Sequence, residues 1–599
     1  MCGIVCICNY SKDITNDHDK LKEMSHLLRY RGPNDSGEFI SPHILMAHRR
    51  LSIIDLKNGQ QPMQYQLYNH QYTITYNGEI YNMIEIKKKL VALGYTFRTT
   101  SDTEVILAAY DAYHEKCVEM FEGIFAFVIS DGKKLFIARD QLGVKPLYYT
   151  IKDKTLIIAS EIKCLLAYLN EAIVDERGIK ELLGLGPSCT PGRTVYRDIY
   201  SLRAGHYMIY DNDLKITRYW KPKEKEHTDD LETTIQTVKQ LVIDSIQKQL
   251  LSDVPISSML SGGLDSSIIS AISSQFINDL STYSISYEGQ KEHFQAYDYQ
   301  TTMDDDYIQE MVERYHTNHE NVILTQKELI DSLKTSLIAR DMPGMADIDS
   351  SFYLFSSEIS SHHRVCLSGE CADEIFGGYP WFYKEELYKQ PHFPWMRDLD
   401  LKMKLFHKDI QKLHIKDYII EQYQKSLKEI NTLDFKKQMM YINMEWFMQT
   451  LLTRCDSQTM RSSLEVRVPF ASTKIFEYLY NMPLNYMFYN NEEKGILRKA
   501  FEDFLPSDIA HRKKNPYPKT HHPLYTKLII EKLNETLQDK NNILYQLFDQ
   551  EQLLQLIQSE GKSFKAPWFG QLMTGPQLLA YLYQIALWGK IYHIKIDRN

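Results

Sequence analysis

Cys2, the second residue of the chain, is a candidate nucleophile. If Met1 is removed, Cys2 carries both a thiol and a free α-amine, whose ordinary pKa values are about 8.5 and about 7.7–8.0. The amine can then act as the base for the nucleophile of its own residue, as it does in N-terminal threonine enzymes. The alternative is structural: Cys2, like Cys6 and Cys8, would simply begin a buried strand.

Four polar segments of the first half supply the groups that such a nucleophile needs. Residues 76–82 (Tyr-Asn-Gly-Glu-Ile-Tyr-Asn) place an amide beside a glycine N–H. Two such donors suit a tetrahedral oxyanion, at about 2.7–4 kcal/mol each. Residues 31–37 and 49–53 carry arginines, and a guanidinium can bind a carboxylate through two parallel hydrogen bonds. Residues 101–104 (Ser-Asp-Thr-Glu) have the pattern of a helix N-cap.

Residues 261–267 (Ser-Gly-Gly-Leu-Asp-Ser-Ser) have the pattern of a phosphate-binding loop. They follow the strand-like residues 254–260 and precede the helix-like residues 268–272. The two glycines let backbone N–H groups approach an anion, and the following helix N-terminus adds partial positive charge. The loop is not of the GxxxxGK[ST] type. The alternation of strand, turn and helix predicts a parallel sheet with a ligand at its carboxyl edge.

Residues 367–379 form a partner segment that again follows a strand-like run. Glu370, Asp373 and Glu374 are spaced i, i+3 and i+4, which predicts that they share one helix face. A solvated acidic face is the alternative. Three adjacent carboxylates repel one another unless a cation lies among them, and carboxylates are ligands for Mg²⁺. The spacing therefore favours a metal-binding segment.

The composition is that of an ordinary globular protein, with 599 residues of which 43% are hydrophobic and 25% charged. At about 150 residues per domain, this length gives about four domains or fewer large ones. The 69 Lys and Arg against 78 Asp and Glu give a net charge of −9, which argues against nucleic acid as a partner. Since no apolar run reaches about 18 residues, no membrane span or membrane partner is expected.

The cysteines and the N-terminus indicate a compartment. Nine cysteines are scattered along the chain without a CxxC pair. This usage predicts a reducing, cytoplasmic environment and no structural zinc site. The apolar N-terminus is short and has no preceding Lys or Arg, so a signal peptide is not expected.

A hydrophilic connector at residues 221–230 divides the chain. We therefore expect a first domain over residues 2–210, a linker over 211–230 and a second domain over 231–599. The first half contains β-like runs at 72–76, 124–129 and 134–138 and a helical patch at 83–93. The second half contains a helical stretch at 231–251, strand-like runs at 254–260, 282–287 and 364–367, and mainly helices from about residue 400.

The first half resembles the glutaminase domain of glutamine amidotransferases that use an N-terminal cysteine. The resemblance implies that Cys2 is the nucleophile and that the Asn77 side chain and the Gly78 N–H form the oxyanion hole. The residues implied to bind glutamine are Arg50, for the α-carboxylate, together with Asn77, Glu79 and Asp102.

The second half resembles pyrophosphate-loop enzymes that cleave ATP between its α- and β-phosphates and adenylate a substrate. The resemblance implies that Asp265 and Asp373 hold Mg²⁺ and that Glu370 handles the proton of incoming ammonia. Lys494 would stabilise charge on the adenylating phosphate, and Arg454 would bind the carboxylate of the acceptor. The residues implied to bind ATP are Leu260, Ser261, Gly262, Gly263, Asp265, Ser266, Ser368 and Gly369.

In this order, the two halves together resemble the glutamine-dependent asparagine synthetases over about residues 2–525. The implied fold is an α+β N-terminal-nucleophile sandwich, with two β-sheets between helices. An α/β parallel-sheet ATP pyrophosphatase domain with a helical C-terminal part would follow it. The implied reaction converts aspartate, glutamine and ATP to asparagine, glutamate, AMP and diphosphate through a cysteinyl thioester, ammonia and a β-aspartyl-adenylate. The oligomeric state is open, with a homodimer as one option.

Several positions depart from the family pattern. They are Asn34 for Asp, Gln141 for Arg, Cys371 for Gly, Ser457 for Arg, and Ala471 and Ser472 for Leu and Asp. Cys371, Ser457 and the change at Ala471 and Ser472 keep open an amidotransferase of the same architecture that acts on another carboxylate, such as a glycan, a peptide or an antibiotic precursor. A third hypothesis is a non-catalytic sensor of glutamine or nucleotide. The basic residues 512–522 are expected to serve pyrophosphate exit or an ATP lid rather than nucleic acid.

Overall fold

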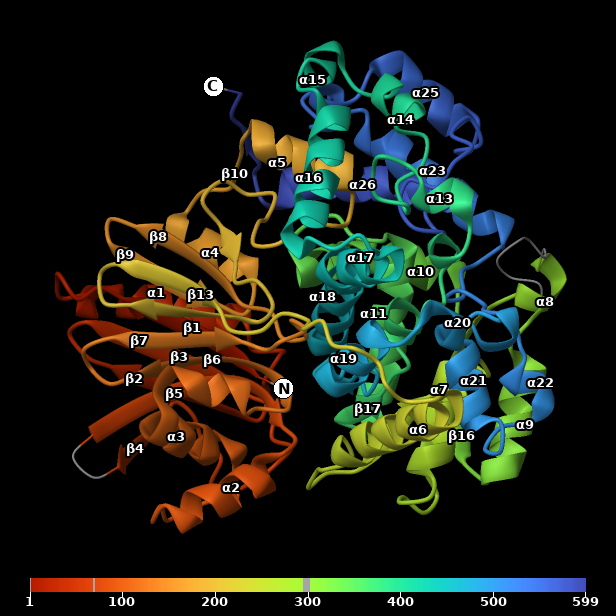
Figure 1. The fold of residues 1–599 in the computed structure, drawn as a ribbon. Coiled ribbons are helices and arrows are strands. Elements are labelled where there is room, and N and C mark those ends of the chain that lie inside the picture. The colour runs from red at the N-terminus through yellow and green to blue at the C-terminus, as the bar shows by residue number, and fades with distance from the viewer. Residues whose placement is uncertain (1, 68–69, 295–301, 599) are drawn as a thin grey trace.

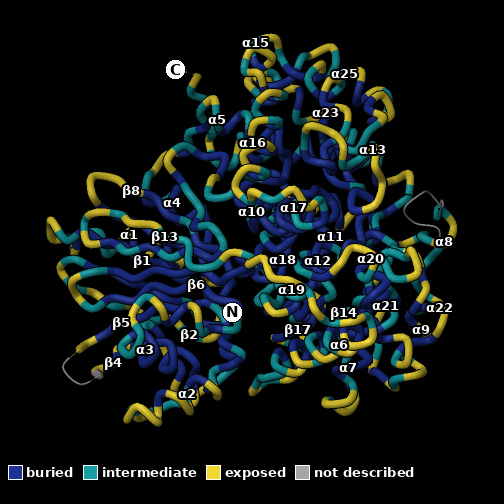
Figure 2. The backbone as a smooth tube through the Cα atoms, in the orientation of Figure 1, coloured by how far each residue is buried: buried dark blue, intermediate teal, exposed yellow. Residues whose placement is uncertain are grey.

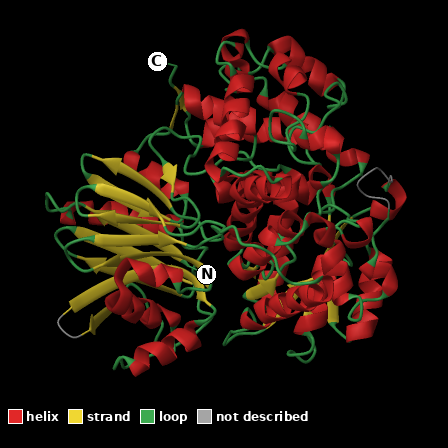
Figure 3. Cartoon of the chain, viewed as in Figure 1, coloured by secondary structure: helices red, strands yellow, loops and turns green. Residues whose placement is uncertain are grey.

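The computed structural model describes residues 2–67, 70–294 and 302–598. Met1, whose removal would free the α-amine of Cys2, lies outside these ranges. A strand-rich part and a helix-rich part lie side by side (Figures 1 and 3). No helix within the described ranges is both long and apolar enough to cross a membrane.

The strand-rich part contains two antiparallel sheets, each of six strands in the described part of the chain. The first sheet has the order β11 (Tyr200–Ser201), β8 (Tyr148–Lys152), β9 (Thr155–Ala159), β1 (Gly3–Cys8), β3 (Ile44–Arg50) and β2 (Asp35–Ile40). The second has the order β13 (Leu214–Arg218), β12 (His206–Tyr210), β7 (Leu135–Arg139), β6 (Gly123–Ser130), β5 (His70–Ile80) and β4 (Met63–Leu67). The β-like runs predicted in this half lie in strands, except that Lys134 precedes β7.

The side chains of β1 explain why the two sheets stack. Ile4, Cys6 and Cys8 belong to a core cluster that joins both sheets, whereas Val5 and Ile7 pack with the helices on the outer face. This is the two-residue alternation of a strand whose faces are both covered. Cys6 and Cys8 are therefore core residues, as the structural reading proposed for them.

Helices cover both outer faces of the sandwich. α1 (His18–Leu27) and α4 (Ile162–Leu169) pack on the first sheet, while α2 (Met83–Ala92) and α3 (Asp102–Tyr113) pack on the second (Figure 1). The predicted N-cap is confirmed, because the Ser101 side chain accepts from the Thr103 N–H at the start of α3. The expected sandwich of two sheets between helices is thus confirmed.

The second part is built on a parallel sheet with the order β16 (Asn318–Leu324), β15 (Ser281–Tyr287), β14 (Ile256–Met259), β17 (Val365–Leu367) and β18 (Glu465–Arg467). The helices of this α/β unit are α6 (Leu231–Lys248), α7 (Leu264–Ser273), α8 (Gln290–His293), α9 (Asp305–Tyr315), α10 (Gln326–Arg340), α11 (Asp347–His362) and α12 (Ala372–Phe376). The predicted parallel sheet is therefore confirmed, with strands slightly different in length from those expected.

The rest of the chain is mainly helical, as predicted. Its helices are α13 (Glu385–Tyr388), α14 (Leu399–Lys404), α15 (Lys408–Gln411), α16 (Ile415–Ile430), α17 (Phe435–Ile442), α18 (Met448–Arg461), α19 (Thr473–Asn481), α20 (Leu484–Met487), α21 (Gly495–Phe501), α22 (Ser507–Ala510), α23 (Pro523–Thr536), α24 (Leu544–Leu547), α25 (Gln550–Gln558) and α26 (Pro576–Ile591). α18 and α26 are largely buried (Figure 2). The chain end then returns to the first part, where β19 (Lys595–Ile596) pairs with β10 (Ile173–Val174), just before α5 (Glu176–Lys180).

Candidate active sites

Cys2 lies just before β1, at the edge of the sandwich that faces the helix-rich part (Figure 1). Only 8% of its surface is exposed. The register that pairs Gly3 with Arg49 places Cys2 beside Arg50. Burial raises the pKa of the Cys2 thiol, although the Leu51 N–H and the Arg50 guanidinium act in the opposite direction. The thiol is therefore neutral near pH 7 and needs a base, a role that a free α-amine on the same residue would fill.

Asn77 lies against Cys2 and has an unused donor. The backbone nitrogen of Cys2 donates to Asn77 Oδ1 at 2.8 Å. Asn77 is fully buried, and its Nδ2 has no acceptor among the described residues. Because an unpaired buried donor costs about 1–3 kcal/mol, an oxyanion at this position would be favoured.

Gly78 follows Asn77 on β5 and has no room for a side chain. Its φ is +153°, and an added Cβ would lie 2.0 Å from the carbonyl oxygen of Ile124. The strand therefore requires glycine here, which leaves the backbone of this position open to close approach.

Arg50, at the end of β3, is buried and held by backbone carbonyls at 2.6–3.2 Å. These carbonyls belong to Ile54, Asp55 and Leu56. They fix the guanidinium without neutralising its charge, so a carboxylate suits this position. Asn34, one of the departures, closes the neighbouring turn: its N–H donates to the Arg50 carbonyl and its Oδ1 accepts from the Ser52 N–H, both at 3.0 Å. The amide keeps this turn in place.

The two expected acceptors for an α-amine lie near β5. Asp102 Oδ2 accepts from Tyr76 Oη at 2.8 Å and from the Ile80 N–H at 3.0 Å. Burial raises the pKa of Asp102 to about 6 against the effect of these donors. Glu79 is also buried, and its Oε1 lies 3.6 Å from Arg467 Nη2 of β18, so this carboxyl faces the second domain.

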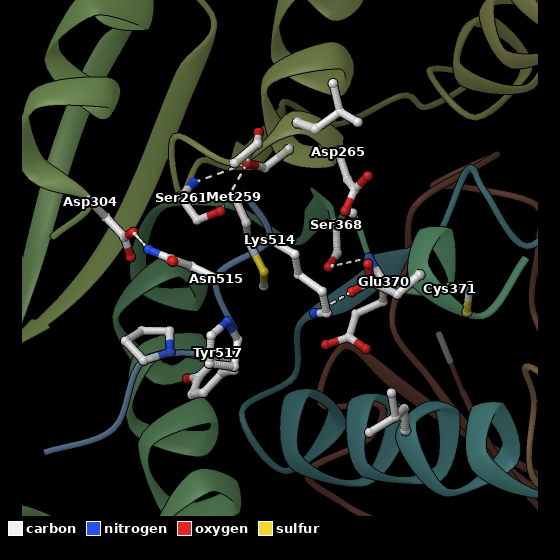
Figure 4. A pocket seen from close by; sticks show the side chains of 18 of the residues that line it. Met259, Ser261, Asp265, Asp304, Ser368, Glu370, Cys371, Lys514, Asn515 and Tyr517 are labelled. Atoms are coloured by element: carbon white, nitrogen blue, oxygen red, sulfur yellow. Dashed lines mark hydrogen bonds and ion pairs between the residues drawn. The ribbon is translucent and has the colours of Figure 1, made fainter. Parts of the chain in front are cut away.

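A cavity of about 240 Å³ lies at the carboxyl edge of the parallel sheet (Figure 4). The register of β14 against β17 pairs Ile256 with Val365, so the loops that follow these strands meet. Gly369 is packed so closely on Asp265 that an added Cβ would lie 3.0 Å from the Asp265 Cβ. The predicted ATP-binding residues that line the cavity are Leu260, Ser261, Gly263, Asp265, Ser266, Ser368 and Gly369.

Gly262 is the one predicted ATP-binding residue that is not among those lining the cavity. Its φ is +65°, and an added Cβ would lie 2.7 Å from the Tyr307 Cβ. Arg512 fixes the loop from the other side, since Nη1 donates to the Gly262 carbonyl at 3.0 Å and Nη2 to Asp304 at 2.6 Å. Gly262 therefore shapes the loop. The basic run that contains Arg512 lines the cavity from residue 512 to residue 518, which accords with a role toward ATP or pyrophosphate.

Lys494 connects the two expected metal ligands. Its Nζ lies 2.6 Å from Asp265 Oδ2 and forms a second ion pair with Asp373 Oδ1. Lys514 Nζ lies 2.6 Å from Asp373 Oδ2. Burial alone would raise the pKa of Asp373, but Lys494 and Lys514 outweigh burial and lower it to about 2. Asp373 is therefore charged throughout the physiological range.

The fit of this pair to Mg²⁺ depends on the donor set. Asp265 Oδ1 is buried and has no hydrogen-bond donor in the described part of the chain. The described residues contain no group of three or more His, Cys, Asp or Glu side chains arranged for a metal ion. Mg²⁺ commonly binds one or two carboxylates together with substrate phosphates and water. Asp265 and Asp373 fit that requirement, with the phosphates supplied by the nucleotide.

Glu370 and Arg454 lie together in the same cavity. Arg454, on α18, forms an ion pair with Glu370, and its guanidinium carbon lies 5.3 Å from the ring centroids of both Phe352 and Tyr517. Cys371 also lines the cavity, buried, with φ +76°. Cys371 thus occupies a left-handed conformation that favours glycine, the residue that the family pattern leads one to expect.

The prediction that three carboxylates share one helix face is wrong. α12 begins only at Ala372, because the positive φ of Cys371 ends any continuous helix before it, and Glu370 lies in the preceding turn. Glu374 points to another partner and accepts from Tyr379 Oη at 2.6 Å. Burial, followed by the neighbouring Asp373, raises the pKa of Glu374 to about 8, so this carboxyl is largely neutral. The three carboxylates thus have different partners: Glu370 pairs with Arg454, Asp373 with two lysines, and Glu374 with Tyr379.

Arg31 is a link between the domains that the sequence did not predict. Its guanidinium is fully buried and donates through Nε to the Cys2 carbonyl at 3.0 Å. The same group binds Asp456 of α18 at 2.8 and 3.1 Å, and Glu161 at 3.0 Å. Asp456 is two residues from Arg454, which lines the cavity at the parallel sheet. The Arg31 side chain therefore connects Cys2 to the helix that contributes to this cavity. The arginine in the polar turn was visible in the sequence, but its partner was not.

The C-terminal segment also reaches the cavity at the carboxyl edge of the parallel sheet. Gly570, Gln571 and Leu572 line it, although the sequence led us to expect only a helical C-terminal part here. Trp568 and Trp588 are indeed fully buried core residues. No motif in the segment pointed to the cavity, because the contact arises from long-range packing, in which the Phe569 ring stacks on Phe447 with centroids 5.6 Å apart.

The remaining departures lie away from the reacting groups. Gln141 is buried and donates to the Phe121 carbonyl at 2.9 Å. Ser457 Oγ donates to the Arg454 carbonyl at 3.2 Å within α18. Ala471 and Ser472 line a different cavity, between the two domains. These residues support the scaffold.

The fold and the sites define a class of protein. A buried cysteine at the start of an antiparallel sandwich is joined to a parallel-sheet domain whose cavity is lined by a glycine-rich loop and by lysines and arginines, an arrangement expected of an amidotransferase coupled to an ATP-using synthetase.

Comparisons with known proteins extend this result. The family described as asparagine synthase matches residues 237–589, and the glutamine amidotransferase domain matches residues 1–220. Asparagine synthetase [glutamine-hydrolyzing] 3 of Bacillus subtilis strain 168 is 45% identical over 100% of both chains. Asparagine synthetase [glutamine-hydrolyzing] 1 of the same organism is 30% identical over 86% of this chain and 87% of its own. Asparagine synthetase B [glutamine-hydrolyzing] of Escherichia coli strain K12 is 30% identical over 86% of this chain and 82% of its own. The chain belongs to the asparagine synthase family, in its glutamine-hydrolysing form.

Proposed function

We propose that this chain catalyses the glutamine-hydrolysing synthesis of L-asparagine. L-aspartate, L-glutamine, ATP and water would give L-asparagine, L-glutamate, AMP and diphosphate. The full-length similarity to relatives that carry this name supports the overall reaction. The assignment of steps to residues is our own inference from the two sites.

In the first site, the Cys2 sulfur would attack the amide carbon of glutamine while its proton passes to the Cys2 α-amine. The oxyanion would be bound by Asn77 Nδ2, which is buried with no acceptor in the described residues, and by the Gly78 N–H. Collapse would release ammonia and leave a thioester, which water hydrolyses to glutamate. Arg50 would hold the substrate α-carboxylate, and Glu79 and Asp102 its α-amine.

In the second site, the aspartate side-chain carboxylate would attack the α-phosphorus of ATP and displace diphosphate. Lys494, bound to Asp265 and Asp373, would neutralise charge on the phosphoryl oxygens. Ammonia would then attack the acyl-adenylate, with Glu370 taking up its proton, and AMP would leave. Arg454 would bind a carboxylate of the acceptor.

We further propose Mg²⁺ as the companion of ATP, held by Asp265 and Asp373. When bound, the ion would neutralise phosphate charge and orient the leaving diphosphate. The buried Asp265 Oδ1 without a donor in the described chain supports this role.

The observation that carries the proposal is the link through Arg31, which binds both the Cys2 carbonyl and Asp456 on the helix of Arg454. Free ammonia is mostly protonated near pH 7 and then is no nucleophile, so the two sites gain from contact through a buried interface. A homodimer, a cytoplasmic location and domain limits of 2–210 and 231–599 with a linker at 211–230 remain proposals.

The test is the variant Cys2→Ala, assayed with glutamine and with ammonium chloride. We expect loss of glutamine-dependent asparagine formation and retention of the ammonium-dependent reaction. The matched control is Cys6→Ala, in the core of the same strand, which should keep both activities if it folds. Loss of both activities in a folded Cys2→Ala protein would refute the two-site scheme.

A further inference from the structure

A cavity lined by four arginines lies outside both active sites and is distinct from the one lined by Ala471 and Ser472. We call it the arginine cavity. Its volume is about 80 Å³. Four guanidinium groups line it, while Glu445 is the only acidic side chain among its described lining residues. The lining arginines are Arg139, Arg193, Arg203 and Arg340.

Arg340, the last residue of α10, has buried donors that lack acceptors. Only 6% of its surface is exposed. Nη2 donates to the Pro187 carbonyl at 2.5 Å, but Nε and Nη1 have no hydrogen-bond partner in the described ranges. The nearest acidic oxygen, Asp349 Oδ2, lies 3.9 Å from Nη1, which is beyond hydrogen-bond distance. Leaving such donors unpaired is costly, so an oxygen-bearing anion here would be stabilised.

Two other arginines of the cavity, unlike Arg340 with Asp349, form no ion pair with the described acidic residues. Arg139 is buried, and carbonyl oxygens, including those of Lys145 and Leu202, accept its hydrogen bonds. No described carboxylate forms an ion pair with it, although Asp140, Asp456 and Glu445 act on its charge from a longer distance. Arg193 is exposed at the cavity and forms no ion pair with the described acidic residues; its guanidinium lies 5.3 Å from the Tyr200 ring centroid.

Arg203 contributes a hydrogen-bond donor to the cavity, whereas its charge is balanced by ion pairs. It pairs with Glu429 and Glu445, which Arg218 also binds, so these four groups are neutral as a set. Its Nε is nevertheless buried and has no acceptor among the described residues. The cavity therefore offers unpaired N–H donors together with the positive charge of Arg193, which no ion pair among the described residues offsets.

We propose that this cavity binds a small oxyanion, of carboxylate or phosphate type, and that the anion stabilises the contact between the two domains. Guanidinium groups bind such anions through paired, charge-assisted hydrogen bonds. Hydroxyl groups of Thr194 and Thr450 also line the cavity and can complete the shell. Because Thr450 lies on α18 and Arg193 precedes β11, a bound anion would touch both domains.

The test is thermal unfolding of the full chain titrated with inorganic phosphate or with succinate, at constant ionic strength set by chloride. A ligand that binds only the folded state raises the unfolding midpoint in a saturable way. The ATP cavity is filled with α,β-methylene-ATP and Mg²⁺, and the glutamine site is blocked with the alkylating analogue 6-diazo-5-oxo-L-norleucine. Binding that remains with both sites filled belongs elsewhere on the protein.

The variants Arg193→Gln and Arg340→Gln locate the site. We expect the apparent dissociation constant of the anion to be at least tenfold larger in each variant. The control is Arg29→Gln, at an exposed arginine outside the cavity, which should leave binding unchanged. If Arg340→Gln does not fold, the titration of Arg193→Gln, a change at an exposed residue, is sufficient to test the site. A response to phosphate only, to succinate only or to both identifies the ligand class. No saturable shift, a shift abolished by filling the active sites, or equal binding in all variants would overturn the proposal.

Discussion

The two active sites manage charge in opposite ways. The Cys2 site is nearly closed, its nucleophile is neutral at rest, and its main unused group is the Asn77 Nδ2, a dipole with no acceptor among the described residues. The second site is an open cavity in which Lys494 and Lys514 hold charged carboxylates. Under the proposed mechanism, the first would stabilise one transient oxyanion, whereas the second would bind a polyphosphate that carries several charges throughout the reaction.

This difference indicates where substitution should matter most. In the open site, loss of a lysine leaves two carboxylates facing an anionic substrate. In the closed site, loss of one dipole weakens only the transition state. Arg31 belongs to both sites, since it binds the Cys2 carbonyl and Asp456, so its removal should disturb stability and coupling together.

Lys494→Met should have the largest effect. Asp265 and Asp373 would then repel ATP, and the phosphoryl charge would lose its cation, so AMP formation should fall by at least about 10³-fold with either nitrogen source. AMP release measured with glutamine and with ammonium tests this. Lys499→Met, on α21 just after Lys494 but paired with the exposed Glu502, should remain close to wild type. Near-normal AMP formation in Lys494→Met would show that another cation serves the phosphates.

Arg31→Met tests the link between the sites. It leaves Asp456 buried without its ion-pair partner, whereas Glu161 keeps Lys163. Breaking a buried pair typically lowers the free energy of unfolding by about 3–5 kcal/mol. We also expect glutamate to form in excess over asparagine. Urea unfolding and the glutamate-to-asparagine ratio are the measurements, with Arg29→Met as the exposed control. A stable variant with a ratio of one would contradict the coupling.

Asn77→Ala should separate the two sites. Removing one oxyanion donor costs about 10²–10³-fold in kcat, so glutaminase turnover should fall by that amount while ammonium-dependent synthesis is unaffected. The exposed Asn58→Ala is the control. An equal loss in both assays would mean that Asn77 supports the fold rather than the oxyanion.

Asp102 gives the glutamine site a pH dependence. Burial raises the pKa of Asp102 to about 6, so the carboxylate that would receive the substrate amine is lost as pH falls below about 6. The kcat/KM of glutaminase should therefore fall with this ionisation. Because the folded pKa exceeds the ordinary value of about 3.9, the same group opposes folding at neutral pH and does so less as pH falls toward 4. Asp102→Asn should raise KM and remove this inflection, and an unchanged profile would exclude Asp102 from glutamine binding.

Cys371→Gly should have the smallest effect. The left-handed conformation at φ +76° costs a side chain about 1–2 kcal/mol, and glycine's extra freedom in the unfolded chain offsets part of the gain. A net stabilisation of up to about 1 kcal/mol is expected in urea unfolding. Cys371→Ala keeps the strained Cβ and serves as the control. If both variants behave alike, backbone strain is not the reason.

The sequence predicted features that depend on local chemistry. The N-cap at Ser101 and the strand–turn–helix order around the loop at residues 261–267 both follow from short-range rules. The structure bears out the two kinds of sheet and the helical C-terminal part.

Features that depend on long-range packing were not predictable. Arg31 and Asp456 are 425 residues apart in sequence, so only the folded interface reveals their pairing. Gln571 lines the cavity at the parallel sheet, although its segment carries no recognisable motif. The acidic segment misled the helix-face prediction, because the i, i+3, i+4 spacing cannot show that Cys371 interrupts the helix.

The central claim is that one chain hydrolyses glutamine at one site and uses the ammonia to amidate an adenylated aspartate at another. The most direct test measures AMP, diphosphate and amino-acid products with glutamine, ATP and Mg²⁺, in the presence and absence of L-aspartate. We predict AMP release that requires aspartate and is matched by asparagine. Glutamate and ammonia released without aspartate-dependent AMP would contradict the claim and point to a different carboxylate as the acceptor.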